Sequence, residues 1–325
     1  MNNKKLAAID IGTNTFRLLI ASVNFNPRNN SYSFKEIFSE RIITRIGDGI
    51  HANRLLGEDA INRSISALCK FSDIIASHDV FMTSAVATSA LREADNSSIF
   101  IQKIREAAGL EIRIISGNEE AAITSSGMLI NVSPPESALM ADIGGGSTEL
   151  IFYSRGKLLR TLSVNLGVVY MANKYMTKDP PSHIDRDKMD KEISAVIIEK
   201  AAGLKDLKKD TTVFLGTAGT VTALAAMTQN LSVFDHSRVH NYILPLKKVK
   251  EIFTVISALS SAEREKHIPF ELARLDIIVP GTRILLKLME TFGFNEITVS
   301  NYGLREGILI DLYKKMAGKE DGTEI

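Results

Sequence analysis

Residues 141–150 combine three adjacent glycines with two carboxylates, between two apolar runs. This pattern predicts a strand, a tight turn and a second strand. Glycines allow a close turn and leave bare N–H groups, which suit the oxygens of a phosphate. Asp142 enters the turn, and Glu149 leaves it two residues after Ser147. Carboxylates beside a phosphate need a divalent cation between them, typically Mg²⁺. The stretch predicts a phosphate loop with a metal site, and the alternative is an ordinary glycine hairpin with solvated acids.

Residues 8–20 near the N-terminus repeat this plan. When the two stretches are aligned without a gap, Asp10 falls on Asp142 and Arg17 falls on Glu149. Two such units imply two similar half-molecules, whose turns can face each other across a cleft and hold one phosphate chain from two sides. Arg17 could grip a phosphate in bidentate fashion, or it could pair with an acid of its own half. Both interpretations stay open.

Composition limits the class of protein. The 325 residues are enough for two domains, and a formal net charge of +1 gives no global basic field for nucleic acid or a membrane. The single cysteine, Cys69, excludes an intrachain disulfide and is expected to be buried and inert in an apolar helical pattern. A reduced, cytoplasmic setting fits this cysteine usage. The first residues lead directly into a strand pattern, and no apolar run is long enough for a bilayer, so we expect neither a signal peptide nor a membrane partner.

The order of predicted elements determines where these loops lie. The first half reads as a β-β-β-α-β-α-β series with strands at 6–11, 16–24, 33–46, 80–87 and 111–116 and helices at 58–76 and from about 97 to 108. This order is typical of a ribonuclease-H-like half-domain. In the second half we expect helices at 168–176, 187–202, 246–259, 270–279 and 282–292. A third loop of small residues, at 216–222, joins a strand to a helix, and it is either an anion site or only a tight turn.

Five motifs now stand in a characteristic order. They are Asp-Ile-Gly-Thr-Asn-Thr at 10–15, Ser-Gly-Asn-Glu-Glu-Ala at 116–121, Asp-Ile-Gly-Gly-Gly-Ser-Thr-Glu at 142–149, Gly-Thr-Ala-Gly-Thr at 216–220 and Gly-Leu-Arg-Glu-Gly at 303–307. Over nearly the whole chain this set resembles the exopolyphosphatase / guanosine pentaphosphate phosphohydrolase family of the actin–hexokinase superfamily. The resemblance implies an α/β chain of two ribonuclease-H-like domains of actin-like ATPase type, facing each other across a cleft. Domain I would comprise 1–124 with 305–325 as a returning C-terminal helix, and domain II would comprise 125–304.

The resemblance implies a phosphoanhydride hydrolase that depends on Mg²⁺ or Mn²⁺. Its substrate would be inorganic polyphosphate, pppGpp (giving ppGpp), or both, with release of the terminal orthophosphate. Water would attack in line with Glu120 as the base, whereas the residues alone favour a first-turn acid that stabilises its helix. The alternatives are a pppGpp phosphohydrolase with little polyphosphate activity, an actin-like kinase, and a non-catalytic polyphosphate-binding protein. The oligomeric state is open, and the family suggests a homodimer.

The resemblance also assigns site residues. Asp142 and Glu149 resemble metal-associated acids, and we add Asp10 to them. Arg17, Arg92 and Arg274 are further candidates for contacts with the substrate. Phosphate contacts are expected from Gly12, Thr13, Asn14, Gly144, Gly145, Gly146, Ser147, Thr148, Gly216, Gly219 and Thr220.

The sequence departs from the family pattern in two ways. The third loop reads Gly-Thr-Ala-Gly-Thr where many relatives have Ala-Ser-Gly-Thr or Gly-Gly-Thr. The sequence also lacks the C-terminal helical extension of the long members, so we expect poor action on very long polyphosphate.

Overall fold

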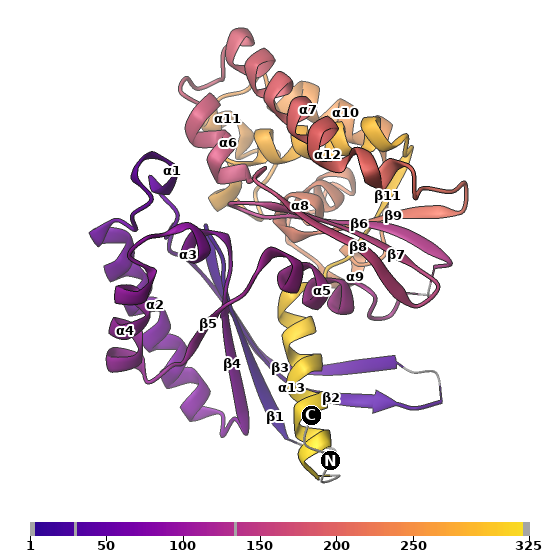
Figure 1. Ribbon diagram of the computed structural model, residues 1–325. Coiled ribbons are helices and arrows are strands. Elements are labelled where there is room, and N and C mark those ends of the chain that lie inside the picture. The colour runs from indigo at the N-terminus through magenta and orange to yellow at the C-terminus, as the bar shows by residue number, and fades with distance from the viewer. Residues whose placement is uncertain (1–3, 29–30, 133–134, 321–325) are drawn as a thin grey trace. The chain divides into compact units, whose positions relative to one another are not determined.

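The computed structural model describes residues 4–28, 31–132 and 135–320. The chain divides into two compact units, Met1–Ser133 with Tyr302–Ile325, and Pro134–Asn301 (Figure 1). The predicted ends of domain I at 1–3 and 321–325 lie outside the described residues. The predicted boundary after 124 would cut α5 (Gly117–Met128), which packs whole against α13 (Leu304–Glu320) in the first unit. The division therefore falls after α5 and before α13.

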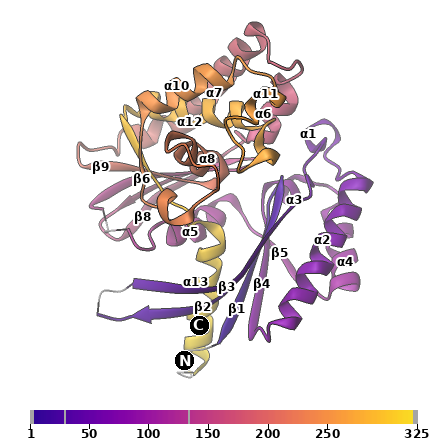
Figure 2. The same cartoon turned by 180° about the vertical axis from the view of Figure 1, so that it is seen from behind.

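The first unit is built on a five-stranded sheet with the order β3-β2-β1-β4-β5. Its further elements are β1 (Lys5–Ile11), β2 (Thr15–Asn26), β3 (Ser31–Ile43), α1 (Ile50–Asn53), α2 (Glu58–Ser77), β4 (Met82–Ala87), α3 (Ser89–Glu93), α4 (Ser97–Ala108) and β5 (Ile112–Ile114). Side chains alternate between the faces of a strand. Ile9 and Phe16 accordingly join the core under α2 and α4, while Leu6 and Ala8 join the core under α13. Figures 1 and 2 show these helices on opposite faces of the sheet.

The second unit is built on a six-stranded sheet with the order β10-β11-β9-β6-β7-β8. Its strands are β6 (Ser137–Ile143), β7 (Thr148–Ser154), β8 (Lys157–Val164), β9 (Thr212–Thr217), β10 (Ile243–Pro245) and β11 (Glu296–Val299). Its helices are α6 (Val168–Tyr175), α7 (His183–Lys205), α8 (Ala218–Thr228), α9 (His236–Val239), α10 (Leu246–Ile256), α11 (Ser261–Arg264), the short 3-10 helix η1 (Leu272–Arg274) and α12 (Ile278–Phe292). One apolar core joins the sheet to α6, α7, α8 and α12.

The two sheets share one topology. Without β10, the order β8-β7-β6-β9-β11 matches β3-β2-β1-β4-β5 strand for strand. In both sheets the first three strands pair antiparallel and the last two join them in parallel. The predicted α/β fold with two ribonuclease-H-like halves is therefore confirmed.

The helices predicted at 270–279 and 282–292 are wrong as separate elements. Only the short η1 lies in the first range, and one helix, α12, begins at Ile278. Pro280 is its third residue. The first four N–H groups of a helix have no intrahelical acceptor, so proline sacrifices no hydrogen bond there. One helix therefore runs through the gap that the prediction left at 280–281.

Two further expectations concern the burial of the cysteine and the absence of a membrane-spanning segment. Cys69 on α2 is half-buried rather than buried as expected, and its Sγ lies 3.6 Å from the Ala107 carbonyl oxygen. Within the part of the chain that the structure describes, each helix is too short or too polar to traverse a bilayer.

Candidate functional site

The two glycine turns have the same backbone geometry, each in its own unit. The Gly144 N–H donates to the Ser147 carbonyl oxygen at 2.9 Å, and the Gly12 N–H donates to the Thr15 carbonyl oxygen at 3.3 Å. A Cβ on either glycine would lie 3.0 Å from that same acceptor. A side chain would therefore crowd the hydrogen bond that closes the turn, which favours glycine in both repeats.

Each turn brings a row of side chains to the end of its sheet. Asp10 lies directly opposite Arg17 across β1 and β2, and Asp142 lies directly opposite Glu149 across β6 and β7. Directly opposite residues share a face of the sheet, with Cβ atoms about 5 Å apart. On β8, Ser163 extends the second row beside Glu149. The structure thus places the two predicted metal-binding acids of the second unit side by side.

The Glu149 carboxylate is held by two hydroxyl groups. Ser147 Oγ and Ser163 Oγ both donate to its Oε1 at 2.7 Å, and Glu149 is only 1 % exposed. Asp142 is half-buried. Among the described residues, no group of three or more His, Cys, Asp or Glu side chains is gathered as a metal site. Mg²⁺ often takes only one or two protein carboxylates and keeps several waters, so this donor pair fits the ion.

Helix α6 supports the glycine loop. The Val168 and Val169 N–H groups donate to the carbonyl oxygens of Gly144 and Gly145 at 3.0 and 2.9 Å. A Cβ on Gly167, the N-cap of α6, would come within 2.2 Å of the Gly145 carbonyl oxygen and of the Gly146 carbonyl carbon. The backbone of the loop is therefore fixed against the start of α6, which explains a further glycine that the sequence analysis gave no role.

Helix α6 is in turn anchored by Glu192 of α7. This carboxylate accepts hydrogen bonds from Tyr170 Oη at 2.8 Å and Lys174 Nζ at 2.6 Å, and also from the Tyr175 hydroxyl. Burial raises the pKa of Glu192, but the hydrogen bonds from Lys174, Tyr175 and Tyr170 outweigh it and hold the pKa below its ordinary value. The anchor is therefore an ionised group that ties α6 to α7.

The predicted phosphate ligand Thr148 instead has an internal partner. Its Oγ1 donates to the Leu166 carbonyl oxygen at 2.5 Å, and the residue is fully buried. This hydrogen bond joins the start of β7 to the segment that leads into α6. The structure thus places the Thr148 hydroxyl in the scaffold of the loop.

The third loop, between β9 and α8, contains small residues for packing. A Cβ on Gly216 would lie 2.4 Å from Ile297 Cδ1 of β11. Thr220 is buried, and its Oγ1 lies 2.2 Å from the position of a Cβ on Gly281 of α12. Gly216 and Thr220, both predicted to contact phosphate, therefore lie in close contacts between elements, as a tight strand-to-helix turn requires.

Arg274 lies beside this loop. Its Cζ is 1.8 Å from the position of a Cβ on Gly219, so the guanidinium fills the space that a side chain would need. Arg274 is buried, and its Nε lies 3.6 Å from Glu271 Oε1. Ala218 has a φ of 72°, a left-handed conformation that favours glycine. Of the predicted residues here, Gly219 and Arg274 are brought together.

In the first unit, Glu120 lies in the first turn of α5 and is 7 % exposed. Its Oε2 accepts a hydrogen bond from Arg92 Nη1 at 3.0 Å, and the same nitrogen is 2.9 Å from the Ile115 carbonyl oxygen. Arg92, predicted to contact the substrate, therefore holds the predicted base. Glu119 forms an exposed ion pair with Arg113 instead. The neighbouring acids thus lie in different surroundings.

Asp10 lies among charged groups, of which Arg305 and Glu306 were not assigned by the sequence analysis. Burial raises its pKa, the charges of Arg17 and Arg305 lower it, and Glu306 raises it again. Glu306 accepts hydrogen bonds from the Gly303 N–H at 2.8 Å and from Arg305 Nη2 at 3.4 Å. The signal that could have revealed Arg305 and Glu306 was the motif at 303–307.

The first loop has its own support. The Thr44 and Arg45 N–H groups donate to the Asn14 carbonyl oxygen at 3.2 and 3.0 Å, and the Gly47 N–H donates to the Thr13 carbonyl oxygen at 3.0 Å. Thr13 is buried, and its Cγ2 lies 2.2 Å from the position of a Cβ on Gly47. The segment 44–47 therefore has the same relation to the first loop as the start of α6 has to the second.

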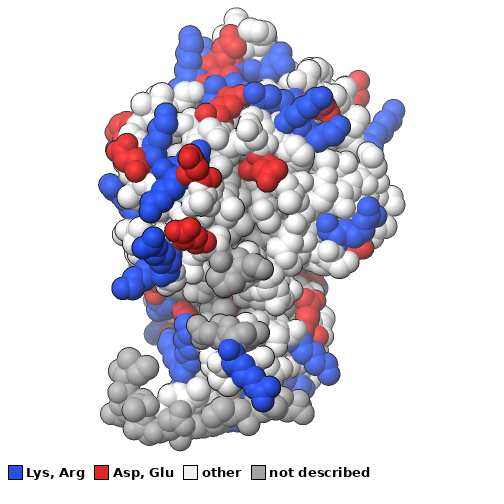
Figure 3. All heavy atoms as spheres, turned by 90° about the vertical axis from the view of Figure 1, so that its right-hand side faces the viewer, with Lys and Arg blue, Asp and Glu red and all other residues white. Residues whose placement is uncertain are grey.

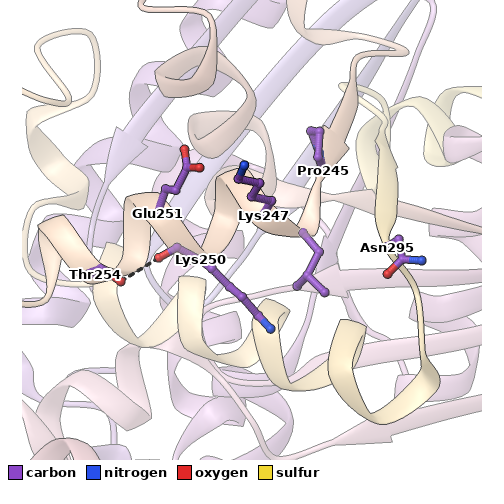
Figure 4. A pocket seen from close by; sticks show the side chains of 7 residues that line it. Pro245, Lys247, Lys250, Glu251, Thr254 and Asn295 are labelled. Carbon is purple, nitrogen blue, oxygen red and sulfur yellow. Dashed lines mark hydrogen bonds between the residues drawn. The ribbon is translucent and has the colours of Figure 1, made fainter.

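A cavity of about 510 Å³ lies elsewhere in the second unit, at the start of α10 (Figure 4). Lys250 lines it and lies 3.2 Å from Glu290 Oε1, and Lys248 beside it lies 2.8 Å from Glu251 Oε2, so both lysines are paired with acids. The lining contains none of the predicted site residues and consists of Pro245, Leu246, Lys247, Lys250, Glu251, Thr254 and Asn295.

Comparison with known proteins establishes the family. The Ppx/GppA phosphatase family matches the chain over residues 27–316. The chain belongs to this family. As a Ppx/GppA phosphatase it is a hydrolase of phosphoanhydride bonds, so the predicted resemblance and enzyme class are confirmed.

Three relatives illustrate the likeness of this Ppx/GppA chain to other proteins. Exopolyphosphatase 2 of Mycobacterium tuberculosis is 26 % identical over 326 residues, which cover 95 % of the chain and 98 % of that protein. The crystal structure of the Aquifex aeolicus Ppx/GppA family member has a TM-score of 0.79 at 28 % identity and covers 96 % of the chain and 98 % of its own. A bifunctional 3-dehydroquinate synthase/phosphatase of Fusobacterium nucleatum is 29 % identical over 95 % of the chain, which spans only 47 % of that relative.

Proposed function

We propose that this protein is an exopolyphosphatase, which releases the terminal orthophosphate of inorganic polyphosphate by attack of water. The observation that carries the proposal is the repeated turn, in which Gly12 and Gly144 close the same backbone hydrogen bond two residues after an aspartate. Two equivalent anion loops suit a substrate that presents successive phosphates. Similarity to an exopolyphosphatase over nearly the whole length of both chains supports the substrate class.

Two side chains of the first unit, Glu120 and Arg92, then have roles. Glu120 orients the attacking water and takes its proton, a contribution of about 10²–10⁴-fold for a general base. Arg92 holds the Glu120 carboxylate, at 3.0 Å from Oε2. Phosphoryl transfer needs little further covalent help, because positioning and neutralisation of charge supply most of the catalysis.

We also propose that Mg²⁺ or Mn²⁺ binds at Asp142 and Glu149. The ion would neutralise charge that develops on the transferred phosphoryl group. Ser147 and Ser163 keep the Glu149 carboxylate oriented, since both hydroxyl groups donate to it at 2.7 Å. Asp10, the remaining predicted metal residue, belongs to the other unit, and its role stays a prediction.

The test measures orthophosphate release from polyphosphate without any acceptor, because a kinase would require one. Glu120→Gln keeps the shape of the side chain but cannot take a proton. We expect turnover to fall by at least about 10²-fold while polyphosphate binding is retained. The matched control is Glu119→Gln, the same change in the neighbour that pairs with Arg113. Activity of Glu120→Gln close to that of Glu119→Gln would remove Glu120 from the mechanism.

Two further arms of the same assay address the metal and the substrate. Excess EDTA should abolish activity, and Asp142→Asn should raise the metal concentration needed for half the maximal rate. Full activity in EDTA would refute the proposed role of the metal.

The nucleotide pppGpp presents the same terminal phosphoanhydride, and we propose it as a second substrate. The value of kcat/KM is therefore measured side by side for pppGpp and polyphosphate. The proposal of a second substrate fails if pppGpp releases no orthophosphate.

A further inference from the structure

Three arginines of the first unit, Arg17, Arg41 and Arg305, gather at one end of its sheet, and we call them the arginine cluster. Arg41 of β3 lies directly opposite Arg17 of β2, which in turn lies directly opposite Asp10 of β1. Residues in such register share one face of a sheet. Asp10, Arg17 and Arg41 therefore form a row across three strands, beside the first glycine turn.

Arg305 reaches this row from α13. Its Nη1 donates to Ser39 Oγ at 3.1 Å, and Ser39 precedes Arg41 by two residues on β3. Residues two apart on a strand point to the same face. The charges of Arg17 and Arg305 both act on Asp10, which indicates that both guanidinium groups lie near its carboxyl group.

The face of the sheet changes character along β1 towards the turn. Leu6 and Ala8 are buried under α13, while Asp10 follows at the next position on that face. Helix α13 begins at Leu304, so its apolar contacts end where the charged row starts. Arg41 is exposed. This end of the face is therefore charged where the rest is apolar. It lies next to the loop that binds phosphate in the proposed function.

The equivalent row of the second unit has the opposite charge. There Asp142, Glu149 and Ser163 occupy the positions of Asp10, Arg17 and Arg41. The same fold thus presents two acids and a hydroxyl in one half, and an acid with two arginines in the other. A row of acids suits a cation, while a row of guanidinium groups suits successive phosphates.

We propose that the arginine cluster binds the phosphates that follow the terminal one in the polyphosphate chain. The inference rests on the proposed function and adds a subsite to it. Guanidinium groups bind phosphate oxygens in bidentate fashion. They are more weakly hydrated than ammonium groups, so their desolvation costs less free energy. Neighbouring strands lie about 4.8 Å apart, so Arg17 and Arg41 can contact a polyanion at two separate points along its length.

The test compares Arg41→Ala with Arg105→Ala. Both residues are exposed and both changes remove one positive charge, but Arg105 lies on α4 and pairs with Glu111 at 2.7 Å. Equilibrium binding of long-chain polyphosphate is measured in EDTA at several salt concentrations. We expect Arg41→Ala to weaken binding about tenfold, since a charged hydrogen bond is lost, and to reduce the salt slope by about one. Arg105→Ala should bind as the wild type does, and Arg41→Lys should restore part of the affinity because it restores the charge without the bidentate contact.

Steady-state kinetics give a second readout. Arg41→Ala should raise KM for long chains at unchanged kcat, because it removes a contact that is made equally before and during the reaction. Equal binding by Arg41→Ala and Arg105→Ala would overturn the proposal, as would a loss of kcat at unchanged KM. Binding is measured without turnover, so a wild-type protein that binds polyphosphate but releases no orthophosphate would contradict the proposed hydrolysis and leave the subsite testable.

Discussion

The Asp10 carboxyl group lies in surroundings that oppose its charge. It is 9 % exposed, and burial raises its pKa above the ordinary value of 3.8 despite the nearby Arg17 and Arg305. The folded protein therefore binds this proton more readily than the unfolded chain does. The resulting contribution to stability is complete below about pH 3.8 and is lost as the pH rises through the folded-state pKa.

We expect Asp10→Asn to raise the melting temperature at neutral pH, because the amide keeps the shape of the side chain without its buried charge. The gain should disappear below about pH 3.8, where the wild-type carboxyl group is protonated as well. Thermal melts over a pH series check this, with Asp48→Asn as the control at an exposed acid of the same unit. A neutral-pH melting temperature no higher than that of wild type would contradict the account.

The hydroxyl residues show where reasoning from sequence stops at this scale. A glycine turn can be predicted because a Cβ would make a tight contact of 3.0 Å at both Gly12 and Gly144. Thr148 and Thr220 belong to the same motifs, yet one donates to Leu166 and the other packs on Gly281. A hydroxyl can bond to a ligand or to its own backbone, and nothing in the sequence separates these choices.

At the scale of elements, α5 and α13 make an unusually close crossing. A Cβ on Gly127 would lie 1.9 Å from the Gly303 carbonyl oxygen, and one on Gly307 would lie 2.0 Å from the Ile123 carbonyl oxygen. In both cases the obstacle is rigid backbone. Because α5 carries Glu120 in its first turn, the crossing sets the position of the proposed base.

We expect Gly307→Ala to destabilise the protein by about 1–3 kcal/mol, the range for overpacking, and to lower kcat as α5 shifts. Denaturant unfolding and turnover are measured on the same preparation. Gly57→Ala is the control, because a Cβ there meets no atom within 4 Å, and its cost as an N-cap change should stay below about 1 kcal/mol. If the two variants are equally stable, the close crossing does not constrain the fold.

The elements themselves were largely predictable, whereas their contacts were not. Alternation and helical spacing located the strands and most helices, since those patterns are local. The α5–α13 crossing joins segments far apart in the sequence, so Gly303 and Gly307 showed only as motif letters and Gly127 gave no signal at all. The row of Asp10, Arg17 and Arg41 could likewise be recognised only from the register in which β3 pairs with β2. The sequence alone does not determine that register.

At the scale of the whole molecule, charge is balanced. The sequence has 39 Lys and Arg against 38 Asp and Glu. On the face drawn in Figure 3, blue and red side chains of the described residues are interspersed. A long polyanion is held strongly only by a continuous series of cations, and that binding weakens steeply with salt. Binding of polyphosphate therefore has to depend on local positive charge, such as that of the arginine cluster.

Affinity should then rise with polyphosphate length only until the chain covers the loops and the arginine cluster, and should be constant beyond the first several phosphates. The measurement is a KM series against chain length at fixed salt, with pppGpp alongside. Arg17→Ala should weaken the binding of both substrates, because Arg17 lies opposite Asp10 beside the first turn and binds a phosphate that follows the terminal one, which both substrates have. A KM that keeps falling up to chains of hundreds of phosphates would show that a basic path along the surface extends the site. The argument from charge balance, that only local positive charge binds the substrate, would then be wrong.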